Sequence, residues 1–287
     1  MRFSFCTLLL ATVQSTLGGV LEPRMCPADN CARAVTGTRS GKVPDVTSRM
    51  ADCSSFMRTT VQPSTTIVPT QVPAYASACS GTVRYSTACS CWGIGSTTIV
   101  PIATYTGVIQ VFSGASSLGY MQADLSYYTP QITSNIALAL KISFQLPGGA
   151  TSGSQLNFNL LNDNRGAFLG LVVGRDSTSS NISPGSFNYL YVDPVSSPGT
   201  PPGSTPQSIP NYFSTAAGVS KQAETAVWSV NLVDGTVTCQ WINTDGSSPG
   251  TLEFAQSNHV YAGGDSGAFH GRFPAAVTGI TFKFVPV

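Results

Sequence analysis

The sequence has few charged residues. Its 287 residues include 14 Lys and Arg and 13 Asp and Glu, which gives a formal net charge of +1. A nucleic-acid-binding protein needs a basic stripe that displaces counterions from phosphates. A chain with this near-neutral balance is therefore not expected to bind nucleic acid.

Histidine is scarcer still, which limits the available chemistry. The two histidines, His259 and His270, lie eleven residues apart, and no cysteine is near them. This is not the spacing of a zinc site. The sequence therefore predicts neither a metal site nor another cofactor.

The segment GGDSGAFHG (263–271) nevertheless contains the Gly-Asp-Ser-Gly sequence that surrounds the nucleophile of chymotrypsin-type peptidases. Such a triad takes its histidine from far upstream. The only upstream histidine here, His259, lies seven residues before Ser266. Gly, Asp and Ser are also the residues of surface turns. Ser266 is therefore predicted to be non-catalytic, and the segment to be a hairpin turn or loop.

Long apolar runs are absent after the first 18 residues. Residues 1–18 combine Arg2 with an apolar run over 5–13 and small residues up to Gly18, which is the pattern of a signal peptide. The run is too short to span a bilayer. The protein is therefore expected to be secreted, in the extracellular space or cell wall, without a membrane span.

Cleavage after Gly18 removes Cys6 and leaves seven cysteines. Six of them lie close together in the sequence: Cys26, Cys31, Cys53, Cys79, Cys89 and Cys91. In an oxidising compartment this even local set predicts three disulfides, and six cysteines allow about fifteen pairings. Only a bridge between the last two is disfavoured by geometry. The seventh, Cys239, is predicted to be a buried free thiol.

Charge and cysteine content both divide the mature chain in two. Residues 19–99 carry seven Lys and Arg and four Asp and Glu, a net charge of +3, whereas residues 100–287 carry six and nine, a net charge of −3. We predict a Cys-rich disulfide module over 19–94, a Thr/Pro-rich linker over 95–106 and an antiparallel β domain over 107–287.

Capping residues predict short helices in the first module. Asp29 or Asn30 can cap a helix that stops at Gly37, Pro44-Asp45 opens a second helix, and a third begins at Pro73.

From residue 107 onward, apolar residues recur at every second position. In ALALKISFQL (137–146) every second residue from Leu138 is apolar. About ten such strands, separated by turn residues, predict a sandwich or barrel. The expected fold class is mainly β, with a small disulfide-stapled helical N-terminal module followed by an antiparallel β-sandwich-like domain.

One hairpin has a register that the sequence specifies. In AVWSVNLVDGTVTCQWIN (226–243), Asp234-Gly235 is the pair preferred in a two-residue type I′ loop. This loop sets Val230 opposite Cys239 and Trp228 opposite Trp241, with the apolar side chains on one face. Both tryptophans are therefore predicted to be buried beside Cys239.

Polar side chains at another predicted hairpin tip form the candidate binding site. The tip consists of Asn162, Asp163, Asn164 and Arg165, whose amide, carboxylate and guanidinium groups are partners for sugar hydroxyls. Tyrosines can stack on the faces of sugar rings. The alternative is that these four residues only form a turn.

A catalytic alternative needs two carboxylates across a cleft, as in glycoside hydrolases. The β domain offers Glu253 and Asp265 for this role. Asn181, in Asn-Ile-Ser, is a candidate N-glycosylation site. We expect a non-enzymatic extracellular or cell-wall protein whose β domain binds a glycan or surface partner, and the alternative is a secreted carbohydrate-active hydrolase.

The Cys-rich module resembles the N-terminal module of uncharacterised secreted fungal proteins. The likeness rests on CPADNCARAV (26–35), ADCSSF (51–56) and PAYASACSGTVRYSTACSCWG (73–93). In those proteins the module precedes a Thr/Pro-rich linker and a variable domain, so the resemblance implies secretion and no particular activity. The Cys-Ser-Cys sequence also has the spacing of the fungal CFEM haem-binding module. That family, however, has eight cysteines and a haem-ligating aspartate where this chain has RYSTA.

Overall fold

The computed structural model describes residues 26, 28–39, 41–61 and 66–287, so the signal peptide predicted over 1–18 lies outside the described residues. The chain divides into two compact units, one ending at Ile99 and the other beginning at Val100. Each unit has a buried core of its own.

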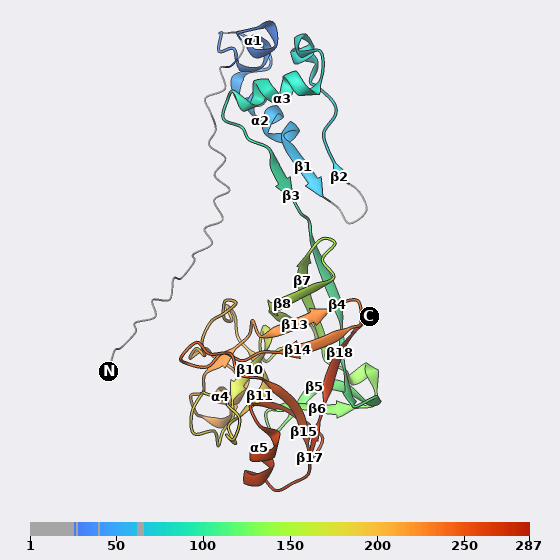
Figure 1. The fold of residues 1–287 in the computed structure, drawn as a ribbon, viewed down its shortest axis with the longest axis vertical. Helices are drawn as coiled ribbons and strands as arrows, with labels where there is room; N and C mark the ends of the chain where they lie inside the picture. Colours follow the sequence, from blue (N-terminus) through green and yellow to red (C-terminus); the bar gives the residue numbers. More distant parts are fainter. Residues whose placement is uncertain (1–25, 27, 40, 62–65) are drawn as a thin grey trace, which may run out of the picture. The chain divides into compact units, whose positions relative to one another are not determined.

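Short helices supply most of the buried core of the first unit (Figure 1). They are α1 (Asn30–Thr36), α2 (Val46–Phe56), the 3-10 helix η1 (Ala74–Cys79) and α3 (Thr82–Ser90). The predicted caps are confirmed, because the carboxylates of Asp29 and Asp45 each accept a backbone N–H of the helix that follows, at 2.8 Å. The sequence does not predict α3, whose Thr and Ser residues have weak helix propensity. Burial of Tyr85 and Cys89 stabilises this helix.

Three disulfides join these helices, as predicted. They connect Cys26 to Cys91, Cys31 to Cys79 and Cys53 to Cys89. The fully buried Arg49 donates to the carbonyls of Val35 and Gly37, at 2.5 and 2.7 Å. It thereby satisfies carbonyl groups that the end of α1 leaves without helical partners.

The segment 95–106, predicted as a linker, forms strands instead. The strand β3 (Thr97–Ile99) pairs in parallel with β1 (Arg58–Val61), which also pairs with β2 (Thr66–Ile67). The strand β4 already begins at Ile102 and pairs from there with β7. The β-branched Thr, Val and Ile residues of this segment favour extended strands, so its composition indicates strand rather than linker.

The second unit is built on one sheet of 15 strands in which every pairing is antiparallel. Its strands are β4 (Ile102–Ser113), β5 (Ser116–Ser126), β6 (Thr129–Thr133), β7 (Lys141–Pro147), β8 (Ser152–Leu156), β9 (Phe158–Leu160), β10 (Phe168–Val173), β11 (Tyr189–Val195), β12 (Ala223–Glu224), β13 (Trp228–Asn231), β14 (Thr236–Cys239), β15 (Leu252–Gln256), β16 (His259–Gly263), β17 (Val277–Gly279) and β18 (Thr281–Pro286). Its short helices are η2 (Ile136–Leu138), α4 (Tyr212–Ala217) and α5 (Ser266–Arg272).

The strand predicted over 137–146 begins only at Lys141. Asn135 accepts the N–H of Ala137 and caps η2, so the chain is helical where the alternating pattern predicts strand. Leu138 is consequently 50% exposed, whereas the later apolar residues of the segment are buried as predicted.

The sheet folds back on itself to enclose its main core, which makes it sandwich-like. In the strand order, β7, β4, β18 and β14 separate β9 from β13. The ring of Trp228 on β13 nevertheless stacks on Phe158 of β9, with ring centroids 5.1 Å apart. Its indole N–H also donates to the carbonyl of Leu169 on β10 at 2.7 Å. The two halves of the sheet therefore face each other across Trp228.

The hairpin 226–243 keeps its predicted faces, but its predicted register is wrong by two residues. Trp228 pairs with Cys239 and Val230 with Val237, so the loop covers residues 232–235. A slip of two residues leaves each side chain on its own face. Both tryptophans and the free Cys239 are therefore buried, as predicted.

Local hydrogen bonds explain the longer loop. The side chain of Asn231 accepts the N–H of Val233, and Asp234 accepts the N–H of Thr236, both at 2.9 Å. In this loop only Gly235 has a positive φ, of +77°. A type I′ turn needs positive φ at both central residues, so the side-chain bonds select a different turn.

Candidate functional site

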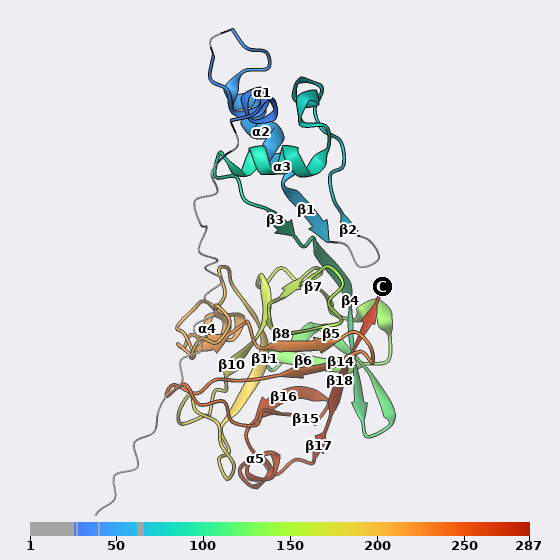
Figure 2. The same ribbon diagram turned by 45° about the horizontal axis from the view of Figure 1, so that its top comes forward.

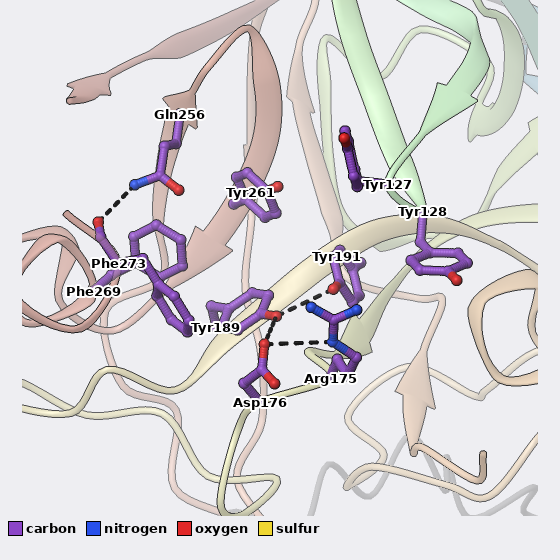
Figure 3. Close-up of a pocket in the computed structure, with 10 residues that line it drawn as sticks. All are labelled: Tyr127, Tyr128, Arg175, Asp176, Tyr189, Tyr191, Gln256, Tyr261, Phe269 and Phe273. Carbon is purple, nitrogen blue, oxygen red and sulfur yellow. Dashed lines mark hydrogen bonds and ion pairs between the residues drawn. The ribbon is translucent and has the colours of Figure 1, made fainter. Parts of the chain in front are cut away.

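A pocket of about 180 Å³, lined largely by aromatic side chains, opens in the second unit (Figure 3). Its lining residues are Tyr127, Tyr128, Arg175, Asp176, Tyr189, Tyr191, Gln256, Tyr261, Phe269 and Phe273. Pockets for drug-sized molecules measure roughly 300–1,000 Å³. This smaller pocket suits a single ring.

Strand pairing places three of the tyrosines side by side. Tyr189 and Tyr191 alternate along β11 and therefore point to the same face, whereas Leu190 packs into the main core on the other face. Tyr261 of β16 is directly opposite Tyr191. Its ring centroid lies 6.0 Å from that of Tyr191 and 5.8 Å from that of Tyr189. The sheet thus holds a fixed aromatic floor.

Another wall of the pocket is a two-residue turn made of two tyrosines. Ser126 pairs with Thr129, so Tyr127 and Tyr128 alone connect β5 to β6. Their φ angles are +48° and +68°, as in a type I′ turn, which prefers Asn-Gly or Gly-Gly. A left-handed conformation costs a residue with a side chain roughly 1–2 kcal/mol. Tyr127 is 75% exposed, so its burial does not offset this cost.

The helix α5, which lies beside β15 and β17 in Figure 2, brings two phenylalanines to the pocket. Asp265 caps it, because its carboxylate accepts the N–H groups of Gly267 and Ala268 at 2.9 Å. The prediction that GGDSG is a hairpin turn or loop is therefore wrong. Aspartate is favoured at turns and at helix N-caps for the same reason, its ability to accept nearby backbone N–H groups. The helix positions Phe269, and Phe273 directly follows its end.

Few polar groups surround these rings. The Tyr189 hydroxyl lies 3.1 Å from the Tyr191 hydroxyl and donates to the Asp176 carboxylate at 3.5 Å. Gln256 donates its amide N–H groups to two backbone carbonyls, at 2.8 and 2.9 Å. Its side-chain oxygen points toward Tyr261 and can accept a hydrogen bond (Figure 3).

Burial keeps the phenols of the floor neutral. It raises the pKa of Tyr189 and Tyr191, and it raises the pKa of Tyr261 to about 12. All three hydroxyls are protonated at neutral pH, as ordinary phenols also are, and can donate hydrogen bonds.

The charged residues of the lining form one pair. The Nε of Arg175 lies 3.5 Å from the Asp176 carboxylate, and that carboxylate is the main cause that raises the pKa of Arg175. The two charges compensate each other, so the lining has no net charge.

The residues predicted to bind a ligand do form the tip of the hairpin between β9 and β10, but most of their side chains are engaged within the protein. Asn162 bonds two backbone groups, at 2.8 and 2.9 Å. Arg165 forms an ion pair with Asp163 at 2.8 Å, and the Asp163 side chain is only 1% exposed. Asn164 is exposed. None of the four lines the aromatic pocket.

Glu253 and Asp265 make separate local contacts. The Glu253 carboxylate accepts the N–H of Cys239 at 3.0 Å and lies 3.5 Å from its thiol. Burial raises the pKa of both Glu253 and Cys239. Asp265 is the helix cap, and the N–H of Ala268 is the first cause of its lowered pKa. Neither carboxylate lines the aromatic pocket, and a catalytic role for the pair stays a prediction.

The other candidate residues also have defined positions. Ser266 begins α5, and His270, one turn later, has Nδ1 at 3.0 Å from a backbone carbonyl. His259 is buried on β16. The Asn181 side-chain oxygen accepts the N–H and the hydroxyl of Thr244 at 2.9 Å. That Ser266 is non-catalytic and that Asn181 carries a glycan both stay predictions.

Sequence reasoning missed the pocket, although one local signal was present. The alternation Tyr189-Leu190-Tyr191 indicates two tyrosines on one face of a strand. No local pattern shows that β16, some 70 residues later, pairs with that strand. The Tyr127-Tyr128 turn gives no signal either, because type I′ turns rarely contain tyrosine.

No family profile, curated protein or solved structure matches this chain. In the part of the chain that the structure describes, no helix is long and apolar enough to cross a membrane. The same residues contain no group of three or more His, Cys, Asp or Glu side chains suited to hold a metal ion.

Proposed function

We propose that the protein is a secreted, non-enzymatic protein of the extracellular space or fungal cell wall, and that its β domain binds one sugar ring of a glycan in the aromatic pocket. The Tyr127-Tyr128 turn is the observation that carries this proposal. Residues that hold a strained left-handed backbone conformation cluster at functional sites. Here it presents two aromatic rings toward a fixed aromatic floor.

The chemistry of the lining suits a sugar. A pyranose has apolar C–H faces, which stack on aromatic rings, and hydroxyls, which need hydrogen-bond partners around the rim. The tyrosine rings supply the stacking surface. The phenol hydroxyls and the Gln256 oxygen supply the hydrogen-bond partners. A pocket of about 180 Å³ admits one ring, so the ligand is a chain end or a side branch of a glycan.

Binding is favoured over hydrolysis by the carboxylates at the pocket. Glycoside hydrolysis uses a pair of carboxylates flanking the scissile bond. Asp176 is the one carboxylate of the lining, and Arg175 and Tyr189 already occupy one of its oxygens.

Three disulfides within the first unit support secretion. They close loops between residues that are 65, 48 and 36 positions apart. Disulfides of this kind form and persist in oxidising compartments such as the extracellular space.

A glycan array probed with the secreted protein tests this function. Tyr127→Ala should reduce the affinity for the selected glycan about five- to tenfold, because one stacking surface is lost. Leu118→Ala is the matched control, since Leu118 is an exposed apolar residue of the same hairpin, 39% accessible, and lies outside the pocket lining. Absence of binding to every glycan, or equal losses in the two variants, would contradict the proposal.

A further inference from the structure

Arg175 is the one cation of the pocket lining, and its outer edge is unused. Its side chain is 61% exposed, and its Nε faces the Asp176 carboxylate. Among the described residues, neither terminal nitrogen of Arg175 has a hydrogen-bond partner. In Figure 3 both terminal nitrogens lie on the side of the Tyr191 hydroxyl, away from Asp176.

The other two arginines of this unit lie outside the pocket lining. Arg165 donates to Asp163 and to a backbone carbonyl, and its guanidinium lies over the ring of Tyr212 at 5.2 Å. Arg272 lies over Phe273, with its guanidinium carbon 5.5 Å from the ring centroid. Arg175 alone of the three both lines the pocket and keeps two donors available for a ligand.

A guanidinium edge with two parallel N–H donors matches a carboxylate, which it binds through two hydrogen bonds. The Asp176 carboxylate lies 3.5 Å from the Nε of Arg175 and so leaves the two terminal nitrogens to a ligand. The second unit as a whole has a net charge of −3, so a general attraction for anions does not explain a free arginine at this place.

We propose that the sugar ring bound in this pocket carries a carboxylate, so that the ligand is a glycan containing hexuronic acid, and that Arg175 selects it. This inference rests on the proposed function. The ring stacks among the tyrosines, and its carboxylate points to the two free nitrogens of Arg175. The neutral phenols of Tyr189, Tyr191 and Tyr261 do not repel the anion.

Calorimetric titration of the full secreted chain tests the inference. The probes are trimers of galacturonate, glucuronate and mannuronate at neutral pH. Each is tested as the acid, whose carboxylates are ionised, and as the methyl ester, which keeps the ring and removes the charge. For at least one trimer the acid should bind about tenfold or more tightly than its ester, because a charge-assisted hydrogen-bond pair is lost in the ester. Arg175→Met should reduce the affinity for the acid to about that for the ester.

Two further variants separate charge from geometry. Arg175→Lys keeps the positive charge but loses the pair of parallel N–H donors. Its affinity for the acid should therefore lie between that of the wild type and that of Arg175→Met. Arg272→Met is the matched control, since Arg272 is an exposed arginine of the same unit that does not line the pocket, and the variant should bind the acid as the wild type does. Unchanged melting temperatures show that the variants are folded.

The outcomes distinguish the inference from the proposed function. Equal binding of acid and ester, binding of neutral glycans only, or preference for a sulfated neutral sugar over every uronate would overturn the inference and leave glycan binding intact. Absence of binding to any glycan would overturn both.

Discussion

At the scale of single residues, the pocket depends on a tyrosine in a conformation that suits other residues better. Tyr127 has φ +48° at the first position of its turn. Tyr127→Asn should raise the free energy of unfolding by about 0.5–1 kcal/mol, because asparagine tolerates left-handed backbone. The same change should weaken glycan binding. Urea unfolding and calorimetry measure the two effects.

A neighbouring turn provides the control. Ser257, with φ +49°, begins the turn between β15 and β16. Ser257→Asn should stabilise the protein similarly without changing glycan affinity. If Tyr127→Asn is instead less stable than the wild type, the Tyr127 ring stabilises the fold by packing, and its conformation needs no ligand to explain it.

Two buried carboxyls should make stability depend on pH. Burial raises the pKa of Asp193 to about 8 and that of Glu224 to about 9. Because these folded-state pKa values lie above those of the unfolded chain, the stabilisation is complete below about pH 4 and is lost as the pH rises toward 8 and 9. Within this window each group lowers the free energy of unfolding by up to about 1.4 kcal/mol per pH unit.

Urea unfolding at several pH values from 4 to 9 measures this loss. Asp193→Asn removes one titrating group and retains an oxygen that can accept the N–H of Phe213, now bonded at 2.8 Å. The variant should show a shallower decline with pH. A wild type that becomes more stable as the pH rises would contradict the burial of neutral carboxyls.

At the scale of elements, Gly235 fixes the loop of the tryptophan hairpin. Its φ is +77°, and a Cβ added there would lie 3.1 Å from the carbonyl oxygen of Phe284. Gly235→Val should therefore lower the free energy of unfolding by about 1–3 kcal/mol. Val233→Thr, at a residue of the same loop that is 78% exposed, should change it by less than about 0.5 kcal/mol. Equal effects, measured by thermal unfolding, would show that the backbone at Gly235 is not constrained.

The same hairpin shows how far sequence predicts structure. The alternation of apolar residues indicates which side chains are buried, and it correctly predicts the burial of Trp228 and Cys239. It does not determine the register, because a slip of two residues preserves the faces. The bonds made by Asn231 and Asp234 decide the loop, and they become visible only in three dimensions.

The sequence predicts the capped helices better than it predicts the pocket, because a cap depends on nearby residues and the pocket on residues that are distant in the sequence. Asp29 and Asp45 predict their helices because a cap acts on the next few residues. The pocket combines Tyr128 of the β5–β6 turn with Tyr191 and Tyr261, which lie opposite each other on β11 and β16. Their proximity depends on strand order, which the alternation of residues does not encode.

At the scale of the whole molecule, the two units have separate cores and separate means of stabilisation. The three disulfides lie within the first unit, and the free Cys239 lies in the second. Replacing Cys53 and Cys89 together by alanine should destabilise the first unit by about 2–5 kcal/mol and leave glycan binding by the second unit unchanged. Calorimetric melting together with a binding titration checks both. Loss of glycan binding in this variant would contradict the independence of the units.

The central claim is that the aromatic pocket holds the ligand. Titration of isotope-labelled protein with the glycan selected on the array, followed by NMR of the tyrosine and asparagine side chains, tests it most directly. We expect the resonances of Tyr127, Tyr191 and Tyr261 to shift in proportion to bound glycan, and those of Asn162 and Asn164 to stay unchanged. Shifts confined to the 162–165 hairpin tip, with the tyrosine resonances unchanged, would contradict it.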